Sequence, residues 1–240
     1  MTRDVPRSIS AVAIHSRMKT LGRPSHAAVL QHFFKTEPGQ YGAGDRFLGL
    51  RVPLLRKLAR EYQALPLGDV TGLLKSPWHE ERLLALFILV RQYARGDGAH
   101  RAAIYRLYMR STSQINNWDL VDCSAEHIVG AHLRDGRRSR LRQLAKSHRV
   151  WERRIAVTAT FHYIKRGEFD TTLDVARLLL DDPHDLIHKA VGWMLREIGK
   201  RDRGVEEGFL RHYVRRMPRT MLRYAIERFP HRLRRSYLAA

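Results

Sequence analysis

Residues 79–90 read HEERLLALFILV, a polar first turn followed by an unbroken apolar stretch, and this segment decides the fold class. Its apolar side chains recur at the spacing of one helix face, as in Leu84 and Ile88. The same order of polar start and apolar continuation returns at 151–162, WERRIAVTATFH, and at 185–196, DLIHKAVGWMLR. Period-two alternation is hard to find elsewhere. The sequence therefore predicts an all-α protein of about a dozen helices.

The helical segments repeat along the chain. Arg82 and Arg154 lie 72 residues apart with Trp118 halfway, and a further step of 35 residues reaches Lys189. A period of about 36 residues with two helices per unit predicts an α-solenoid of HEAT-like helical repeats. A compact helical bundle is the alternative interpretation of the same pattern. No Pro/Ser-rich linker divides the chain, so residues 1–240 are expected to form a single domain.

Equivalent positions of a solenoid line one surface, often the concave one. The equivalent positions found above form a first column: Arg82, Trp118, Arg154 and Lys189. One helical turn further along lies a second column, which contains Asp122 and Trp193. Since residues four apart share a helix face, Trp118 is expected beside Asp122, and Lys189 beside Trp193. The sequence thus predicts a concave basic groove that holds two tryptophans, one carboxylate and flanking cations.

The charge balance points to a polyanionic partner. The chain has 44 Lys and Arg against 24 Asp and Glu, a net charge of +20. This excess favours nucleic acid, whose phosphates match the two-pronged guanidinium of arginine. The very basic stretch within residues 205–240 is interpreted as capping helices that extend this positive field. The longest apolar run, residues 83–90, is far shorter than the ~20 residues of a membrane helix, so no membrane partner is expected.

Several other kinds of site are disfavoured. The single cysteine, Cys123, allows neither an intramolecular disulfide nor a Cys cluster for metal, and no signal peptide is visible, so a cytoplasmic, nucleoid-associated protein is expected. His184 and His188 have a metal-compatible spacing, but without an HExxH motif neither a metal nor any other cofactor is predicted. The glycine-rich residues 34–53 lack a nucleotide-binding motif and are interpreted as a structured loop.

Asp122 is the candidate for chemistry. A carboxylate repels phosphate in a DNA-binding groove, so stabilising positive charge on a sugar, or positioning water, would justify its presence. An N-terminal helix acid or an arginine partner explains the same residue structurally. Asp119 is interpreted as a cap or first-turn acid. Trp118 and Trp193 are either core residues or exposed stacking faces, and Arg154 is preferred to Arg153 as a phosphate contact only for its place in the column.

The chain resembles the AlkD-like DNA alkylation repair family, the HEAT-like repeat alkylpurine DNA glycosylases. The resemblance runs from about residue 33 to residue 229, while residues 1–30 find no match. It rests on five segments together: FFKTEPGQYGAGDRFLGLRVPLLRKLA, INNWDLVDCSA, WERRIAVTATF, HKAVGWMLREIGKRD and MPRTMLRYAIERF.

The resemblance implies hydrolysis of the N-glycosidic bond of cationic N3- or N7-alkylated purines, such as 3-methyladenine and 7-methylguanine, in double-stranded DNA, without a metal. It implies a monofunctional hydrolase acting in base excision repair, and we expect a monomer. The family's acid falls on Asp122, its two tryptophans on Trp118 and Trp193, and its backbone-gripping arginine on Arg154, with Arg153 as the fallback. Lys189 and Arg82 are the further predicted DNA contacts.

Two alternatives stay open at this point. A non-catalytic HEAT-like module that binds DNA by shape would share the fold and the charge and differ only in lacking a working acid. A helical repeat protein associated with RNA or the ribosome would prefer RNA to duplex DNA in competition.

Overall fold

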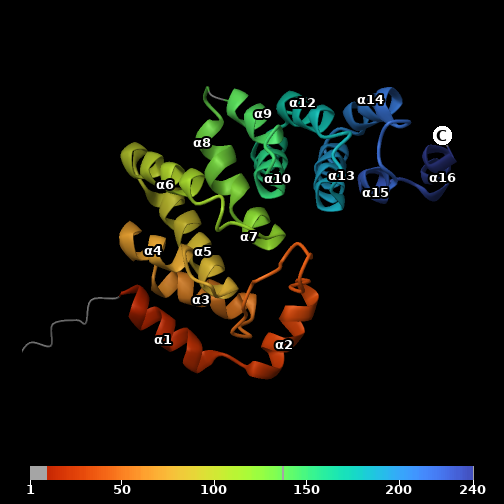
Figure 1. Cartoon of the computed structure of the whole chain (residues 1–240). Coiled ribbons are helices and arrows are strands. Elements are labelled where there is room, and N and C mark those ends of the chain that lie inside the picture. The colour runs from red at the N-terminus through yellow and green to blue at the C-terminus, as the bar shows by residue number, and fades with distance from the viewer. Residues whose placement is uncertain (1–9, 137, 240) are drawn as a thin grey trace, which may run out of the picture. The chain divides into compact units, whose positions relative to one another are not determined.

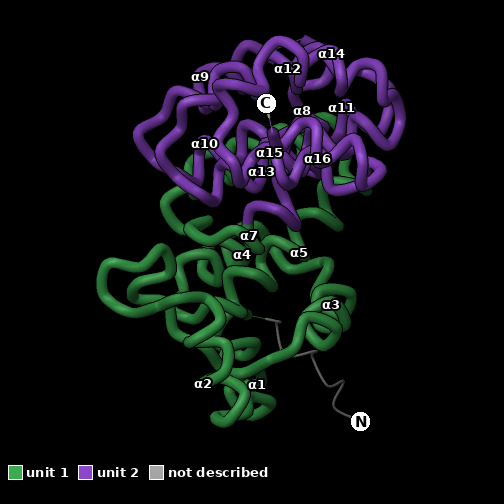
Figure 2. Tube along the Cα trace, turned by 90° about the vertical axis from the view of Figure 1, so that its right-hand side faces the viewer, with its two compact units in different colours: residues 1–120 green, residues 121–240 purple. Residues whose placement is uncertain are grey.

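The computed structural model describes residues 10–136 and 138–239. These residues form an all-α fold in which the only strand-like pairing is an isolated bridge between Arg46 and Trp78, so the predicted fold class is confirmed. Backbone contacts divide the chain into unit 1, Met1–Leu120, and unit 2, Val121–Ala240 (Figure 2). The expectation of a single domain over residues 1–240 stays a prediction.

Unit 1 begins with two helices in the region that matched no family segment in the sequence. Its helices are α1 (Ala11–Leu21), α2 (Pro24–Phe33), α3 (Val52–Glu61), α4 (Leu67–Leu74), α5 (His79–Arg95) and α6 (Gly98–Arg110). The short helix α7 (Trp118–Asp122) contains the boundary between the units. Helix α5 packs against α3 and α4 and buries Leu84 and Ile88 completely, which confirms the core face predicted for residues 79–90.

Unit 2 contains the remaining helices. They are η1 (Glu126–Gly130, one π-helical turn), α8 (Ala131–Leu133), α9 (Ser139–Ala145), α10 (Val150–Ala159), α11 (Phe161–Ile164), α12 (Asp170–Leu178), α13 (Asp185–Gly199), α14 (Arg203–Tyr213), α15 (Arg219–Ala225), η2 (Ile226–Arg228, a 3-10 turn) and α16 (His231–Ala239). The basic C-terminal stretch is therefore helical, as expected.

Within unit 2, successive helices alternate between two rows. In Figure 1, α9, α12 and α14 form one row, and α10, α13 and α15 form the other. Helix α10 packs on both α9 and α13, and α13 packs on α12, α14 and α15. The apolar faces of α10 and α13 bury Ile155 and Met194 completely. This alternation of paired helices is the arrangement that a HEAT-like repeat requires.

The same turn precedes three helices of the chain, α5 in unit 1 and α10 and α13 in unit 2. Two residues before the N-cap, a side-chain oxygen accepts the N–H of the N-cap residue, and the carbonyl of that same residue accepts a bond from the fourth helical residue. The pairs that close the turn are Ser76 with Arg82, Ser147 with Arg153, and Asp182 with His188. The side-chain oxygen of each turn accepts an N–H group at the helix N-terminus that would otherwise lack a partner. This seven-residue turn is a structural repeat unit of the chain.

No helix among residues 10–136 and 138–239 combines the length and the apolar character needed to span a bilayer.

Candidate functional site

The carboxylate of Asp122 is held by one arginine. The Arg154 guanidinium donates from Nε to Oδ1 at 2.8 Å and from Nη2 to Oδ2 at 2.7 Å. Its third nitrogen, Nη1, donates to the carbonyl of Leu186. The Arg154 side chain is 7% exposed and that of Asp122 is 19% exposed. Bidentate pairing fixes the plane of a carboxylate as well as its position, so Arg154 holds the partly exposed carboxylate of Asp122 in a defined plane.

The other predicted DNA contacts also face acids. Arg153 donates to Asp182 at 2.6 Å, and Arg82 donates to Asp45 at 2.6 Å; both guanidinium groups are largely buried. Lys189 pairs with Asp185 one turn earlier on α13, and there both side chains are substantially exposed. Among these four basic residues, Lys189 is therefore the one whose charge is best placed to meet a ligand from solvent.

The recurring turn corrects the register of the predicted columns. The sequence spacing paired Arg82 with Arg154, but the bond to the carbonyl six residues earlier is made by Arg82 and by Arg153. In α13 the same position is occupied by His188, and Lys189 follows it. Arg82 is therefore equivalent to Arg153, whereas Arg154 and Lys189 each lie one residue later. The displacement arises because a weak repeat in sequence fixes the period more easily than the phase.

Trp193 lies on α13 beside Phe161, with ring centroids 5.8 Å apart, and its side chain is partly exposed. Lys165 stands over the other aromatic ring at 4.4 Å. The preceding residue, Gly192, allows close approach of α15, because a Cβ there would lie 2.4 Å from the carbonyl oxygen of Met221. The glycine of the Lys-Ala-Val-Gly-Trp segment is thus required by packing next to the tryptophan.

Trp118, the first residue of α7, stacks on Phe34 at 5.4 Å with 26° between the ring planes. The edge of Phe33 meets the same indole at 6.1 Å, and the side chain of Asn117 accepts the backbone N–H of Trp118 at 2.8 Å. Trp118 is partly exposed. It is therefore neither a fully buried core residue nor a freely rotating surface group.

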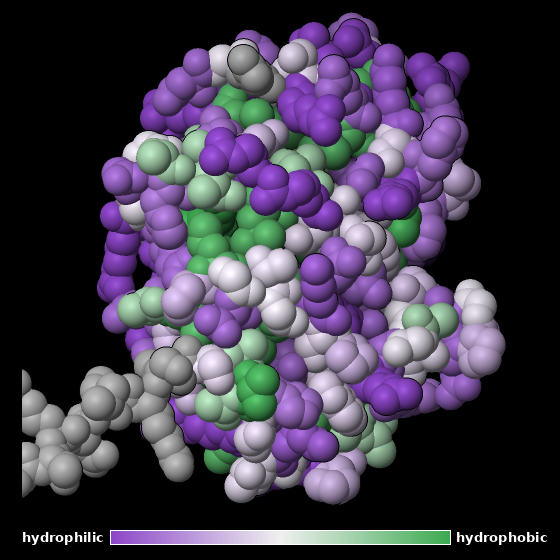
Figure 3. Space-filling model, turned by 60° about the vertical axis from the view of Figure 1, so that its left-hand side comes forward, coloured by the Kyte–Doolittle hydropathy of each residue, from purple (hydrophilic) through white to green (hydrophobic). Residues whose placement is uncertain are grey.

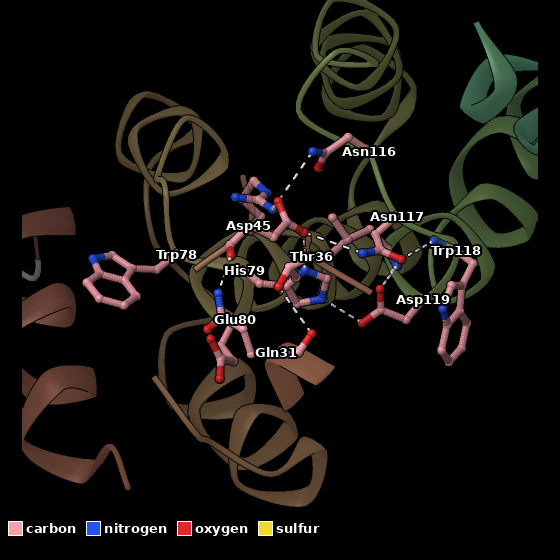
Figure 4. Close-up of polar contacts among 12 residues, drawn as sticks. Gln31, Thr36, Asp45, Trp78, His79, Glu80, Asn116, Asn117, Trp118 and Asp119 are labelled. Atoms are coloured by element: carbon pink, nitrogen blue, oxygen red, sulfur yellow. Dashed lines mark hydrogen bonds and ion pairs between the residues drawn. The ribbon is translucent and has the colours of Figure 1, made fainter. Parts of the chain in front are cut away.

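A buried charged cluster lies next to Trp118, and the sequence did not reveal it (Figure 4). His79 places one ring nitrogen 3.0 Å from Asp45 and the other 2.8 Å from Asp119. Burial alone would lower the pKa of His79, but the two carboxylates outweigh it and raise that pKa to about 9. Burial alone would raise the pKa of Asp45, which His79 and Arg82 instead hold below its ordinary value.

One signal for this cluster was present in the sequence. A helix that is apolar all round is buried, so the polar first turn in front of such a stretch has to be buried with it. In the segment HEER the four residues are each at most 5% exposed: His79, Glu80, Glu81 and Arg82. Buried charges require partners, and the partners come from distant segments that no local pattern identifies.

Asp119 behaves partly as predicted. One of its carboxylate oxygens accepts the N–H of Leu120 within the first turn of α7, at 2.9 Å. Its other oxygen faces His79. The first-turn role is confirmed, and the contact with the histidine is an addition that the sequence did not predict.

The glycine-rich loop is structured, as expected. It binds an anionic group of the protein itself, the side chain of Glu80. The backbone N–H groups of Leu48, Gly49 and Leu50 all donate to the Glu80 carboxylate, at 2.9, 2.8 and 3.1 Å. Gly49 has φ +82°, a conformation that favours glycine. The loop therefore uses its successive N–H groups for internal attachment to α5.

The two histidines with metal-compatible spacing have structural partners. His184 accepts the N–H of Leu186 as the N-cap of α13, and His188 bonds to the carbonyl of Asp182. In the part of the chain that the structure describes, no group of three or more His, Cys, Asp or Glu side chains has the arrangement of a metal site.

The surface carries the excess of charge. Figure 3 shows hydrophilic residues over most of the face in view, with hydrophobic residues in smaller groups between them. Residues 208–239 contain one acid, Glu227, which pairs with Arg196 on α13. The same stretch also contains several exposed arginines: Arg211, Arg219, Arg223, Arg232 and Arg235.

Comparison with known proteins agrees with this architecture. The sequence model of the family described as "DNA alkylation repair enzyme" matches residues 14–229. A solved structure described as a predicted DNA alkylation repair enzyme from Enterococcus faecalis superposes with a TM-score of 0.68 at 17% identity, over 88% of this chain and 97% of that one. At this identity the superposition shows the fold alone. A search of curated proteins finds no match. Because the family match covers most of its length, this chain belongs to the DNA alkylation repair enzyme family.

Proposed function

We propose that this protein is a monofunctional DNA glycosylase that releases cationic N3- or N7-alkylated purines, such as 3-methyladenine and 7-methylguanine, from duplex DNA in base excision repair. The observation that carries the proposal is Asp122, a partly exposed carboxylate held in one orientation by Arg154 in a chain of net charge +20. An oriented carboxylate stabilises positive charge that develops in front of it, and the arginine removes the need to reorganise it during the reaction.

The chemistry suits a single acid. An N3- or N7-alkylpurine is already cationic, so it leaves with the electron pair of the broken C1′–N bond and becomes neutral without a general acid. Positive charge then develops on the deoxyribose, where Asp122 would stabilise it. Water supplies the oxygen that bonds to C1′, and its proton passes to Asp122 or to solvent.

Trp118 and Trp193 would act through their ring faces. Both side chains are partly exposed, and each packs against phenylalanine. An indole face attracts positive charge, so contact with the sugar would be stronger in the oxocarbenium-like transition state than in the ground state.

The DNA contacts predicted from sequence remain part of the proposal. Lys189 is the most exposed of them and would contact phosphate directly. The three arginines among them each pair with an acid: Arg154, Arg153 and Arg82. To contact DNA, each guanidinium would have to bind a phosphate and its carboxylate at the same time. We propose that the protein acts as a cytoplasmic, nucleoid-associated monomer.

One observation favours the second candidate, a non-catalytic module that binds DNA by shape. A bidentate pair with a buried arginine is also what a purely structural acid makes. The two candidates differ in what happens when the carboxylate is neutralised: a structural acid affects stability, and a catalytic one affects base release at full occupancy of DNA.

The decisive experiment measures release of free base from methylated duplex DNA in the presence of EDTA. Wild-type protein is compared with Asp122→Asn under single-turnover conditions with DNA saturated. Asp182→Asn is the matched control, because Asp182 is a similarly paired acid that faces Arg153. The proposal expects release by the wild type and by Asp182→Asn, and a loss of ~100-fold or more in Asp122→Asn.

Other outcomes are equally informative. If none of the proteins releases base although all bind DNA, the glycosylase proposal is wrong and the module that binds by shape takes its place. If Asp122→Asn releases base at the wild-type rate, Asp122 is a structural acid. Preference for RNA over duplex DNA in competition would point to the RNA-associated alternative.

A further inference from the structure

We propose that His79 is a positioning residue for the Trp118 indole, acting through Asp119 and the ring of Phe34. The inference rests on the proposed function, in which Trp118 meets the sugar of the damaged nucleotide. It adds a residue that the family resemblance does not assign, and its geometry lies entirely within unit 1.

The protonation state of His79 follows from its partners. Both ring nitrogens face carboxylate oxygens, Nδ1 that of Asp45 at 3.0 Å and Nε2 that of Asp119 at 2.8 Å. A neutral imidazole has one donor and one acceptor nitrogen. Its acceptor nitrogen would face a carboxylate oxygen, which is also an acceptor, so one of the two contacts would be repulsive. Only the imidazolium donates to both. The His79 side chain is 2% exposed, so water does not compete for these bonds.

The charges around the imidazolium are balanced. Asp45 comes from the loop before α3, Asp119 from α7, and Arg82 from the same helix as His79. Arg82 donates to the second oxygen of Asp45 at 2.6 Å. Two acids thus face two cations, and Asn116 and Asn117 add weaker contacts to Asp45 at 3.4 Å. Removing the proton from His79 would leave one carboxylate in excess in a buried place.

Two connections lead from His79 to the indole. The first is covalent, because Asp119 follows Trp118 in the first turn of α7. The second is a ring stack: the His79 ring lies 4.9 Å from that of Phe34, which in turn stacks on Trp118 at 5.4 Å. Phe47 packs against both rings, 4.7 Å from that of His79 and 5.2 Å from that of Phe34. Movement of the histidine would therefore act on both the backbone and the ring of Trp118.

Helix α7 needs such support. It has five residues, Trp118–Asp122, and a helix this short does not hold its conformation by its own hydrogen bonds. The side chain of Asn117 caps its start, and the contact of Asp119 with His79 attaches its first turn to α5. This attachment holds the first turn of the helix, which carries Trp118.

The first experiment observes Trp118 without requiring activity. Indole N–H signals of the full-length protein are recorded by NMR from pH 6 to pH 10, and the Trp118 signal is assigned with Trp118→Phe. In the wild type this signal is expected to shift with a midpoint near the His79 pKa of about 9. In His79→Gln it is expected at a different position and without that transition.

Glu80→Gln is the matched control. Glu80 is the neighbour of His79, is equally buried, and bonds the loop at Leu48 and Gly49 rather than α7. It is expected to lower stability while leaving the Trp118 titration near pH 9 in place. If His79→Gln fails to fold, Asp119→Asn removes the charge that faces His79, while its amide oxygen still accepts the N–H of Leu120, and it is expected to displace the same signal.

The second experiment measures single-turnover base release at saturating DNA. We expect ~10- to 100-fold slower release in His79→Gln with little change in the affinity for DNA, since misplacement of a contacting group by about 1 Å costs this much. In the wild type the rate is expected to fall above pH 9, and in the variant this alkaline fall is absent.

The outcomes separate the two proposals. A Trp118 signal that is the same in His79→Gln and in the wild type at every pH overturns the positioning role. A Trp118 signal that responds as described, in a protein that releases no base, leaves the positioning role standing and overturns the glycosylase function.

Discussion

Arg154 donates two parallel hydrogen bonds to the carboxylate of Asp122, and its third nitrogen donates to the carbonyl of Leu186, the second residue of α13. One guanidinium thus joins α7 to the start of α13. The arginine fixes the plane of this carboxylate, so the two side chains form one structural unit.

The first prediction concerns that unit. Arg154→Lys keeps the positive charge but loses the planar fork, so Asp122 is expected to lose its fixed orientation. Single-turnover base release should fall ~10-fold or more, with DNA affinity nearly unchanged. Arg153→Lys, which alters the neighbouring pair with Asp182, serves as the control and should retain base release at saturating DNA, where a weakened phosphate contact does not limit the rate. Equal losses in both variants would contradict the special role of Arg154.

The second prediction concerns a buried acid in unit 2. Glu206 is 1% exposed, one of its carboxylate oxygens has no hydrogen-bond partner, and burial raises its pKa from 4.5 to about 8. Because the folded state holds the proton more tightly than the unfolded state, its contribution to stability is present below pH 4.5 and is lost as the pH rises to 8.

Glu206→Gln should therefore match the wild type in stability at pH 4 and exceed it increasingly towards pH 8. The difference is expected to reach about 4–5 kcal/mol. Denaturant unfolding at a series of pH values measures it. A constant difference between variant and wild type across this range would show that Glu206 is not the group that titrates.

A third prediction tests the loop that Glu80 holds. A Cβ at Gly49 would lie 2.1 Å from the carbonyl oxygen of Arg23, and φ is +82°. Gly49→Ala is expected to destabilise the protein by ~2–4 kcal/mol. Gly68 in α4 has open space around it, so Gly68→Ala should be neutral or stabilising by up to ~1 kcal/mol. Thermal unfolding of the two variants side by side gives the comparison.

A fourth prediction addresses DNA binding. Lys189→Gln is expected to weaken binding to duplexes of any sequence and to reduce the slope of log K against log[salt] by ~0.9, the loss of one phosphate contact. Asp185→Asn removes the negative charge that pairs with Lys189 and should strengthen binding. Fluorescence anisotropy at several salt concentrations measures both. An unchanged slope in Lys189→Gln would place this residue outside the interface.

The sequence was sufficient for the fold class because helix periodicity is a local property. The stretch with Leu84 and Ile88 is read from neighbours three and four residues apart, and the structure buries both completely. The partners of buried charges are a different kind of information. Asp45 lies 34 residues from His79, and Asp122 lies 32 residues from Arg154. No spacing rule joins such residues, so the sequence could offer an arginine partner for Asp122 only as one alternative.

The repeat gave an intermediate result. The period of about 36 residues was visible in the sequence, but the sequence did not show which residues of successive repeats are equivalent. Arg82 was therefore paired with Arg154 instead of Arg153. The register of the repeat is given by the turn before α5, α10 and α13, where a serine or aspartate stands six residues ahead of a basic residue. A short polar pattern of this kind is easily overlooked beside a long apolar stretch.

That turn also determines where the chain can change in length. In the turn before α13, the bond from His188 to the carbonyl of Asp182 spans six residues and fixes the first turn of that helix. An insertion inside this span would rotate everything after it by about 100° about the helix axis and carry Trp193 away from its face. An insertion before Asp182 only lengthens the connection from α12. Natural variation in repeat length should therefore collect ahead of the turn, so that repeats of unequal length still present the same face.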